Sequence, residues 1–249
     1  MIKPLYLAIG VFDGVHCGHR YLVGEAIKTA HVREAWAGAL TFHPHPKRVL
    51  QLPNAPELIY PIQQRYWILR KLGCDYVFVK KFTDTWSQSS PEKFFAYLRR
   101  LFPNLSGLYV GEDFHFGHNR EGDVAILEDF CKRSGTIQLH VFRHLQYAGE
   151  RICSTRVRDA LYDGNLELVN HLLGQNYHYI GYVDDHLRFC HHSELKIKDG
   201  LYHCILKNKL YQQALEVSVE NAAIQFQAPI ADALLNKACI LEFIKKLSA

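Results

Sequence analysis

The 249-residue chain has no CxxC pair and no long apolar run. Its seven cysteines form an odd, scattered set, which is typical of small buried side chains in a reducing cytosol. No stretch approaches the ~18 apolar residues of a membrane-spanning helix. The N-terminal residues have one lysine and a short apolar segment without a small-residue cleavage pattern. We therefore expect a cytoplasmic protein with no membrane partner.

The chain also lacks a strong excess of charge. A formal net charge of +4 suits phosphorylated ligands, whereas nucleic-acid binding usually needs a clustered basic face. We expect small-molecule ligands and no nucleic acid; the oligomeric state is left open. Fifteen histidines invite a metal interpretation, but the closely spaced pairs have no convincing third ligand nearby, which disfavours a zinc site. These pairs are His43/His45, His115/His118 and His191/His192.

Short apolar segments alternate with helical ones up to about residue 175. This alternation predicts an α/β fold with a doubly wound parallel sheet. Pro61 and Pro91 suit the first turns of helices, and Ser90 suits an N-cap. The expected strands are 5–9, 37–42, 76–79, 108–110 and 137–142, and the expected helices are 20–34, 61–72, 91–102 and 123–134.

The pattern changes near residue 177. Leu215, Val217 and Val219 alternate with polar residues, which predicts a small, mainly antiparallel β module. Lys196–Leu206 is expected to hold two strands around an Asp199-Gly200 turn, and the spacing over Ala231–Leu247 predicts a C-terminal helix. The expected domains are residues 1–176 and 177–249.

The segment Gly10 to His19, GVFDGVHCGH, joins the first expected strand to the first helix. Unpaired helical N–H groups at such a corner favour an anion, glycines let backbone approach a ligand, and His16 and His19 can donate to phosphate oxygens. The alternatives are a surface pair of histidines or two zinc ligands. Zinc-binding helices prefer an i,i+4 pair with a carboxylate, which this segment lacks.

Three further segments follow expected strands or open a helix. Thr41 to Pro46 reads TFHPHP, a rigid turn or a ligand-lining loop. Val110 to Gly117 reads VGEDFHFG, whose phenylalanines either face flat rings or pack in the core. Ile152 to Arg158 reads ICSTRVR, where a helix is expected to begin. Its hydroxyls can cap that helix and bind phosphate at the same time.

Together these segments resemble the adenylyltransferase module of bacterial FAD synthetases within the HxGH nucleotidyltransferase superfamily. The matching patterns are GVFDG with HxGH, the THFHPHP-like segment, VGxDFxFG…GxxGD, ISSTxxR and the junction LLGRPYxxxG, here near Leu172–Gly181. The resemblance implies that ATP and FMN are converted to FAD and pyrophosphate with Mg²⁺.

The resemblance also implies roles for individual residues, whereas metal ligands stay unassigned. The expected catalytic residues are His16, His19 and Arg158. The expected ATP-binding residues are Gly10, Val11, Phe12, Asp13, Gly14, His16, Gly18, His19, Asp113, Ser154, Thr155 and Arg158, and the expected flavin-binding residues are His43, Pro44, His45, Phe114 and Phe116.

The chain departs from the family pattern in three places. Cys153 replaces the first serine of ISSTxxR, and Asn165 stands where the family has an acid that is thought to assist the active site or metal. Residues 184–249 contain no PTAN motif and a single glycine, Gly200, so we expect a reduced riboflavin-kinase-like module without kinase activity. Two other functions stay open: a transferase acting on another phosphate ester, and a non-catalytic flavin or nucleotide-binding protein.

Overall fold

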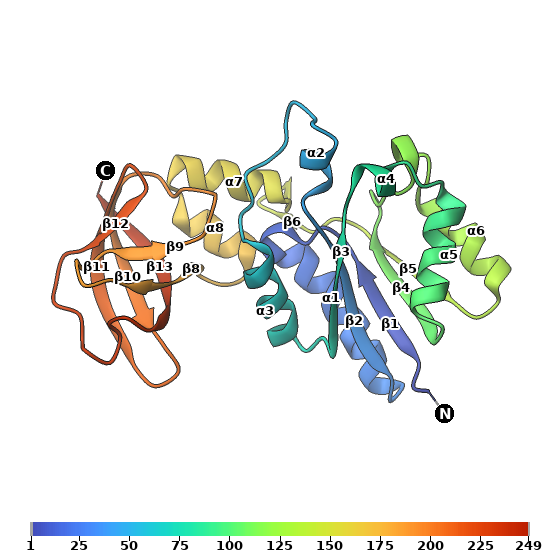
Figure 1. Ribbon diagram of the computed structural model, residues 1–249, viewed down its shortest axis with the longest axis horizontal. Coiled ribbons are helices and arrows are strands. Elements are labelled where there is room, and N and C mark those ends of the chain that lie inside the picture. Colours follow the sequence, from blue (N-terminus) through green and yellow to red (C-terminus); the bar gives the residue numbers. More distant parts are fainter. Residues whose placement is uncertain (1, 249) are drawn as a thin grey trace. The chain divides into compact units, whose positions relative to one another are not determined.

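Five parallel strands form the sheet of the first half of the chain (Figure 1). The computed structural model describes residues 2–248. The strand order is β3-β2-β1-β4-β5, which confirms the expected parallel α/β sheet. The strands are β1 (Leu5–Ile9), β2 (Trp36–His43), β3 (Tyr76–Lys81), β4 (Leu105–Gly111) and β5 (Gln138–Phe142). The helices around them are α1 (Cys17–Val32), α3 (Ile62–Leu72), α5 (Pro91–Leu101) and α6 (Val124–Ser134), with short helices η1 (Asp13–Val15), α2 (Pro46–Val49), α4 (Asp84–Ser87) and η2 (His118–Arg120).

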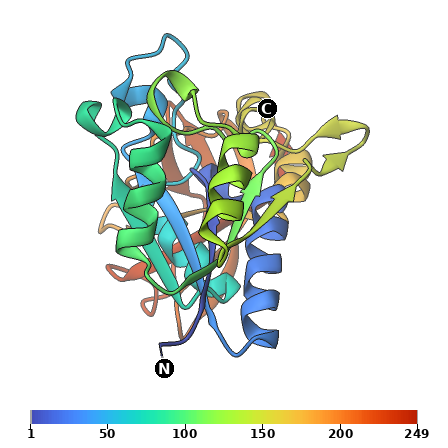
Figure 2. The same cartoon turned by 90° about the vertical axis from the view of Figure 1, so that its right-hand side faces the viewer.

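Every residue of β1 is buried, because helices cover both faces of the sheet (Figures 1 and 2). Leu5, Leu7 and Ile9 share a hydrophobic cluster with side chains of α5 and α6. Ala8, between them, points to the other face, since neighbouring strand residues alternate. The short apolar run in the sequence therefore corresponds to a central strand.

Two helix starts are set by local capping. The side chain of Ser90 accepts a hydrogen bond from the N–H of Lys93, and Pro91 occupies the first turn of α5, as expected. Asp123 caps α6 in the same way by accepting from the N–H of Ile126 at 2.9 Å. Both helices start at these residues because the sequence provides a cap immediately before each apolar face.

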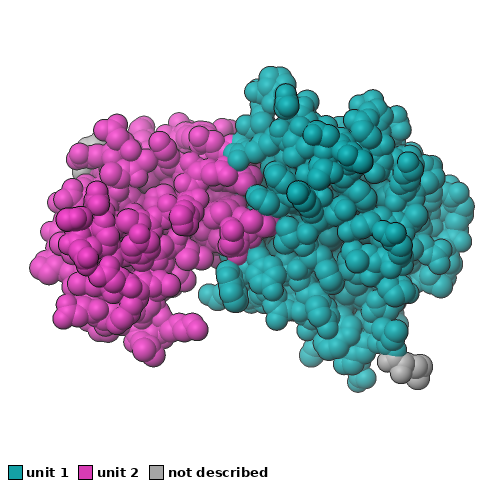
Figure 3. Space-filling model, in the orientation of Figure 1, with its two compact units in different colours: residues 1–56, 65–146 teal, residues 57–64, 147–249 magenta. Residues whose placement is uncertain are grey.

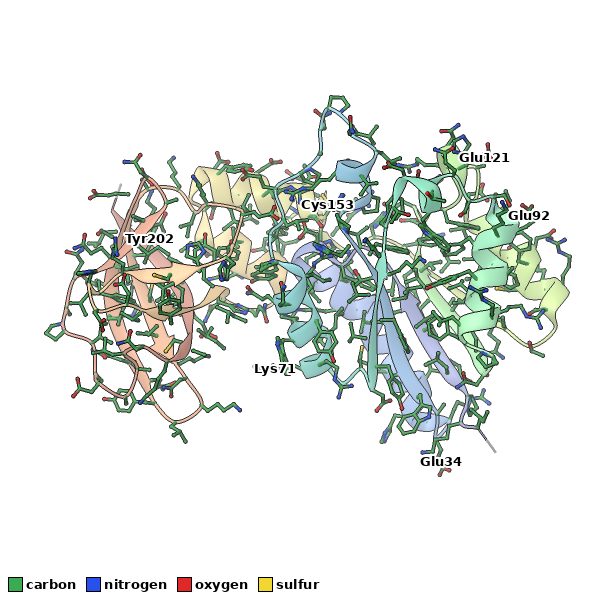
Figure 4. The ribbon with its side chains drawn as sticks, viewed as in Figure 1. Glu34, Lys71, Glu92, Glu121, Cys153 and Tyr202 are labelled. Carbon is green, nitrogen blue, oxygen red and sulfur yellow. The ribbon has the colours of Figure 1, made fainter. Side chains whose placement is uncertain are left out.

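The second half of the chain holds a six-stranded antiparallel sheet in the order β12-β11-β10-β13-β8-β9. An antiparallel bridge between Arg188 and Gln225 joins its two ends, so the sheet is nearly closed into a barrel. Its core is aromatic: the ring centroid of Phe243 lies 5.4 Å from that of Tyr179 and 5.6 Å from that of Tyr202. Tyr202 is labelled in Figure 4. The strands are β8 (Tyr177–Val183), β9 (Phe189–His191), β10 (Gly200–Lys207), β11 (Gln212–Glu220), β12 (Ala223–Phe226) and β13 (Ala238–Ser248).

The expected alternation in β11 is confirmed, since Leu215, Val217 and Val219 are buried. The C-terminal helix expected over 231–247 is wrong, because β13 occupies the positions from Ala238 onward. The expected pair of strands around Asp199-Gly200 is also wrong: Gly200 begins the single strand β10, and the Asp199 carboxylate accepts the N–H of Asn221 instead.

The chain divides into two compact units (Figure 3). Unit 1 comprises Met1–Pro56 and Arg65–Gln146, and unit 2 comprises Glu57–Gln64 and Tyr147–Ala249. Besides the antiparallel sheet, unit 2 contains α7 (Ser154–Asp163) and α8 (Leu166–Leu173). The two-stranded sheet of β6 (Gln146–Tyr147) and β7 (Glu150–Arg151) precedes α7. The domain boundary at 176/177 stays a prediction. None of the described helices is long and apolar enough to cross a membrane.

Candidate functional site

The loop between β1 and α1 has an unusual backbone. Phe12, Gly14 and Val15 have φ values of 53°, 78° and 42°. Glycine adopts this left-handed region readily, but a β-branched residue such as Val15 does so rarely. Val15 is fully buried, so the surrounding packing imposes this conformation. Backbone strain of this kind gathers at ligand-binding loops.

The carbonyl of Val11 fixes the start of this loop. It accepts hydrogen bonds from Thr41 Oγ1 at 2.8 Å and from Arg65 Nη1 at 2.6 Å. Both donors are fully buried. Burying a guanidinium is costly, so an arginine here indicates a specific requirement for its charge or its donors. The sequence pattern does not single out Arg65, because a polar residue near the start of an expected helix is ordinary.

His16 and His19 lie side by side at the start of α1. His16 is the N-cap of the helix, and its Nδ1 accepts the N–H of His19 at 3.4 Å. The two rings stack with their centroids 3.6 Å apart and their planes 17° from parallel. The Phe12 ring meets His19 edge-on at 5.3 Å. The expected pairing of the two imidazoles at a helix N-terminus is present.

The surroundings of His19 oppose its protonation. Burial is the main cause that holds the pKa of His19 well below its usual range, and the positive charges of His16, Arg65 and His144 add to it. The imidazole is therefore neutral near pH 7. A phosphate beside the ring would reverse part of this effect, because a nearby negative charge favours the imidazolium.

Polar residues from two more strands reach the same edge of the unit 1 sheet. Glu112 and Asp113 follow β4, and His144 follows the neighbouring strand β5. The His144 Nε2 atom lies 3.5 Å from Asp113 Oδ2 and 3.8 Å from Glu112 Oε1, and its backbone N–H donates to Glu112 at 2.9 Å. Asp113 was expected in the site, whereas Glu112 and His144 were not. The carboxyl ends of parallel strands are the usual ligand edge of such a sheet.

The residues expected to bind flavin lie in different environments within unit 1. His45 caps α2, since its Nδ1 accepts the N–H of Lys47 at 3.2 Å. His43 ends β2 and is partly buried. Phe116 is buried against Phe94, with centroids 4.8 Å apart, so core packing accounts for it. Phe114 is partly exposed and stacks on Phe116 at 5.6 Å. Their contact with a flavin stays a prediction.

In unit 2, α7 begins where the ICSTRVR segment predicts a helix. Cys153, labelled in Figure 4, is its N-cap and supplies no capping side chain, so the expectation that a hydroxyl caps the helix is wrong. Ser154 and Thr155 are the first helical residues. Arg158 Nη2 lies 3.4 Å from Thr155 Oγ1, one turn apart. The expected cluster of hydroxyls and guanidinium is therefore present on one helix.

Arg156, which lies between Thr155 and Arg158 in the sequence, contacts the β6–β7 hairpin. It forms an ion pair with Glu150 at 3.1 Å and donates to the carbonyls of Tyr147 and Glu150 at 2.9 and 3.0 Å. Arg158 lies two residues further along α7, with its Nη2 near Thr155 Oγ1. Arg158, which the resemblance predicts to bind phosphate, is therefore a different residue from Arg156, which secures the β6–β7 hairpin.

Asn165, which replaces an acid of the family pattern, is the N-cap of α8. Its Oδ1 accepts the N–H of Leu168 at 3.1 Å. Aspartate and asparagine cap helices about equally well, so this contact does not require the missing charge. Among residues 2–248, no group of three histidine, cysteine or acidic side chains is arranged to hold a metal ion.

The FAD synthetase family model matches residues 2–156, more than half of the chain. The chain belongs to the FAD synthetase family. A FAD synthetase of Listeria monocytogenes is 32% identical over 187 residues, which cover 74% of each chain. The bifunctional riboflavin kinase/FMN adenylyltransferase of Bacillus subtilis is 33% identical over 179 residues, 71% of this chain and 55% of that protein.

The Haemophilus influenzae bifunctional enzyme is 32% identical over 183 residues, 74% of this chain and 59% of its own. This FAD synthetase-family chain therefore spans little more than half the length of the bifunctional relatives it matches. A crystal structure titled as a macrolide-efflux protein from Streptococcus pneumoniae aligns with a TM-score of 0.85 over 100% of this chain and 86% of its own. At 20% identity that likeness shows the fold alone.

Proposed function

We propose that this member of the FAD synthetase family transfers AMP from ATP to FMN, yielding FAD and pyrophosphate. The stacked His16/His19 pair at the N-terminus of α1 is the observation that carries the proposal. It provides imidazole donors and helical N–H groups at the carboxyl edge of a parallel sheet. These groups suit phosphate oxygens, and the family identifies the phosphates as those of ATP and FMN.

In this reaction an FMN phosphate oxygen attacks the α-phosphorus of ATP in line. The new P–O bond forms as the bond to the β-phosphate oxygen breaks, and pyrophosphate leaves with the electron pair. His16 and His19 stabilise the charge that gathers on the phosphates, while Gly10, Phe12, Asp13, Gly14 and Gly18 keep the loop close to the nucleotide. Ser154, Thr155 and Arg158 bind the triphosphate, with the Arg158 guanidinium as a two-pronged donor.

Mg²⁺ bound to the triphosphate would neutralise part of its negative charge. This ion uses one or two carboxylates together with substrate phosphates, so a complete protein cage is not required. Glu112 and Asp113 offer carboxylate oxygens of the right kind, with 45% and 54% of their side chains exposed. These carboxylates fit the ion.

The deciding experiment incubates the purified protein with ATP, Mg²⁺ and FMN and separates the flavins by chromatography. We expect equal amounts of FAD and pyrophosphate, and none when Mg²⁺ is chelated. The His16→Asn/His19→Asn double variant is the control against a contaminating enzyme. Folded wild-type protein that forms no FAD would refute the proposal. Product from nicotinate mononucleotide or pantetheine phosphate would identify a different phosphate ester as substrate, and tight binding without turnover would identify a binding protein.

The proposed reaction does not include riboflavin phosphorylation. A kinase site needs a phosphate-holding loop and a base beside the substrate hydroxyl. Residues 184–249 contain neither a PTAN segment nor a glycine-rich loop, and Glu216 and Glu220 are exposed on β11. With riboflavin and ATP as the only substrates, we expect no FMN. FMN formed by protein free of other kinases would contradict this part.

We place the reaction in the cytoplasm. Burial raises the pKa of Cys74 to about 12 and that of Cys131 to about 11, so these thiols stay protonated and act as small apolar side chains. Such cysteines suit a reducing compartment. Fractionation of cells that carry a tagged chain tests this location.

A further inference from the structure

Helices α7 and α8 belong to the same compact unit as the antiparallel sheet, although the family model ends near the start of α7. We call residues 177–248, the nearly closed antiparallel sheet with its loops, the β module. It lacks the kinase motif but keeps a densely packed aromatic core. Within unit 2, the contacts between the β module and helices α7 and α8 indicate a role for the module.

The C-terminal end of α7 meets two lysines of the β module. The helix ends at Gly164, whose φ of 76° makes a left-handed C-cap. Lys198 donates to the carbonyl of Asp163 at 3.4 Å, and Lys246 on β13 donates to the carbonyl of Asp199 at 2.9 Å. A Cβ at Gly164 would lie 3.1 Å from Lys198 and 3.4 Å from the Lys246 ammonium. Positive charge at a helix C-terminus is stabilising.

A second attachment runs through Asn170 on α8. Its amide nitrogen donates to the carbonyls of Phe243 and Ile244 on β13 at 3.2 and 3.4 Å. Its amide oxygen accepts the N–H of Tyr177, the first residue of β8, at 2.8 Å. One side chain therefore binds α8 to two adjacent strands, while the apolar face of α8, including Leu172, is fully buried.

We infer that the β module serves adenylyl transfer as a platform that positions α7, and that Asn170 and Lys198 are positioning residues for ATP. The inference rests on the proposed function, in which Ser154 and Thr155 at the opposite end of α7, with Arg158 one turn further in, bind the triphosphate. The N–H of Asn165, the N-cap of α8, donates to the carbonyl of Ala160 on α7 at 2.8 Å, so a shift of α8 also shifts α7. Displacing a rigid helix at its attached end also displaces the groups at its other end. Small displacements of phosphate-binding groups weaken binding and slow transfer.

The first test substitutes Asn170→Asp in the full chain. The new carboxylate keeps the shape of the amide but has no N–H to donate. Its oxygens repel the two β13 carbonyls, so both hydrogen bonds to β13 are lost. The matched control is Asn208→Asp, which removes an equivalent bond to the Ala233 carbonyl inside the β module. Lys198→Met, with exposed Lys209→Met as its control, gives a second pair at the surface, where folding is not at risk.

Dissociation constants for Mg-ATP and for FMN are measured by calorimetry, together with KM for each substrate. We expect ATP binding to weaken by roughly 3- to 10-fold in Asn170→Asp and less in Lys198→Met, with FMN binding unchanged. Simple destabilisation would lower the active fraction and leave both constants as they were. Equal constants in Asn170→Asp and Asn208→Asp would therefore overturn the inference.

A double-mutant cycle with Arg158→Ala completes the test. Because the inferred effect acts through α7, Asn170→Asp should weaken ATP binding much less once Arg158 is gone. Full additivity would contradict the inference. The calorimetric readout separates the two proposals: ATP binding that depends on Asn170 in a protein that forms no FAD supports the platform while the proposed reaction fails. No ATP binding by the wild type would overturn both.

Discussion

Asn165→Asp distinguishes a helix cap from a lost catalytic acid. The family pattern has an acid at this position, and two explanations predict opposite results for restoring it. In the structure the Asn165 side chain caps α8 through the Leu168 N–H and is exposed to solvent. If capping is its role, aspartate should affect the stability of the fold and leave the chemistry unchanged.

The size of the effect follows from the helix terminus. Aspartate keeps the capping oxygen and adds a negative charge at the positive end of α8, which stabilises by about 0.3–1 kcal/mol at low ionic strength. Glu167 already places one negative charge in the first turn, so the lower half of that range is expected. For a chain of this size the melting temperature should rise by about 1–2 °C. Asn165→Ala, which removes the cap, should cost about 0.5–2 kcal/mol.

Melting curves for the three proteins at low and high salt provide the measurement. The gain in Asn165→Asp should shrink as salt increases, because the interaction is electrostatic and exposed. FAD formation and its Mg²⁺ dependence should equal those of the wild type. A several-fold gain in turnover, or a lower Mg²⁺ requirement, would show that the position belongs to the active site and that the capping argument is wrong.

Three further predictions concern the site residues. Arg158→Ala should slow FAD formation by ~10²–10³-fold, with Arg158→Lys recovering part of the rate, because one preorganised charged donor is lost; unchanged turnover would show that it faces away from ATP. The pKa of His19 is depressed in the folded protein, so the unfolded chain binds a proton at this position before the folded chain does as pH falls below ~6.5, and the free energy of unfolding declines. His19→Gln should therefore lose less stability between pH 7 and pH 5 in melting experiments. Thr41→Val should destabilise by about 1 kcal/mol in urea unfolding, since Arg65 still binds the Val11 carbonyl, and Arg65→Met should cost more.

The central sheet could be predicted from sequence because its signals are local. The bounds of β1 are those expected, since five apolar residues stand between a proline and a glycine. The cap at Ser90 and the alternation in β11 likewise depend only on residues that are close together in the sequence. The spacing of apolar residues is enough to predict an element when only one face of a helix or one side of a strand is buried.

Arg65 and His144 could not be found in this way, because their role depends on contacts distant in sequence. Arg65 reaches the Val11 carbonyl across 54 positions, and His144 meets Asp113 only because β5 lies beside β4. Neither residue is part of a recognisable motif. Both lie close enough to His19 to oppose its protonation, in addition to its burial and to the neighbouring His16.

The helix predicted over residues 231–247 is replaced by strand β13 because the apolar spacing there is ambiguous. The segment KACILEFIKKLS places apolar residues at spacings that suit either a helix or a strand, and only pairing with β10 on one side and β8 on the other decides between them. Cys239, Leu241 and Phe243 then point into the core. A helix would use its own carbonyls in internal hydrogen bonds and could not offer two of them to Asn170. The attachment of α8 to the β module, and with it the inferred positioning of α7, depends on β13 being a strand.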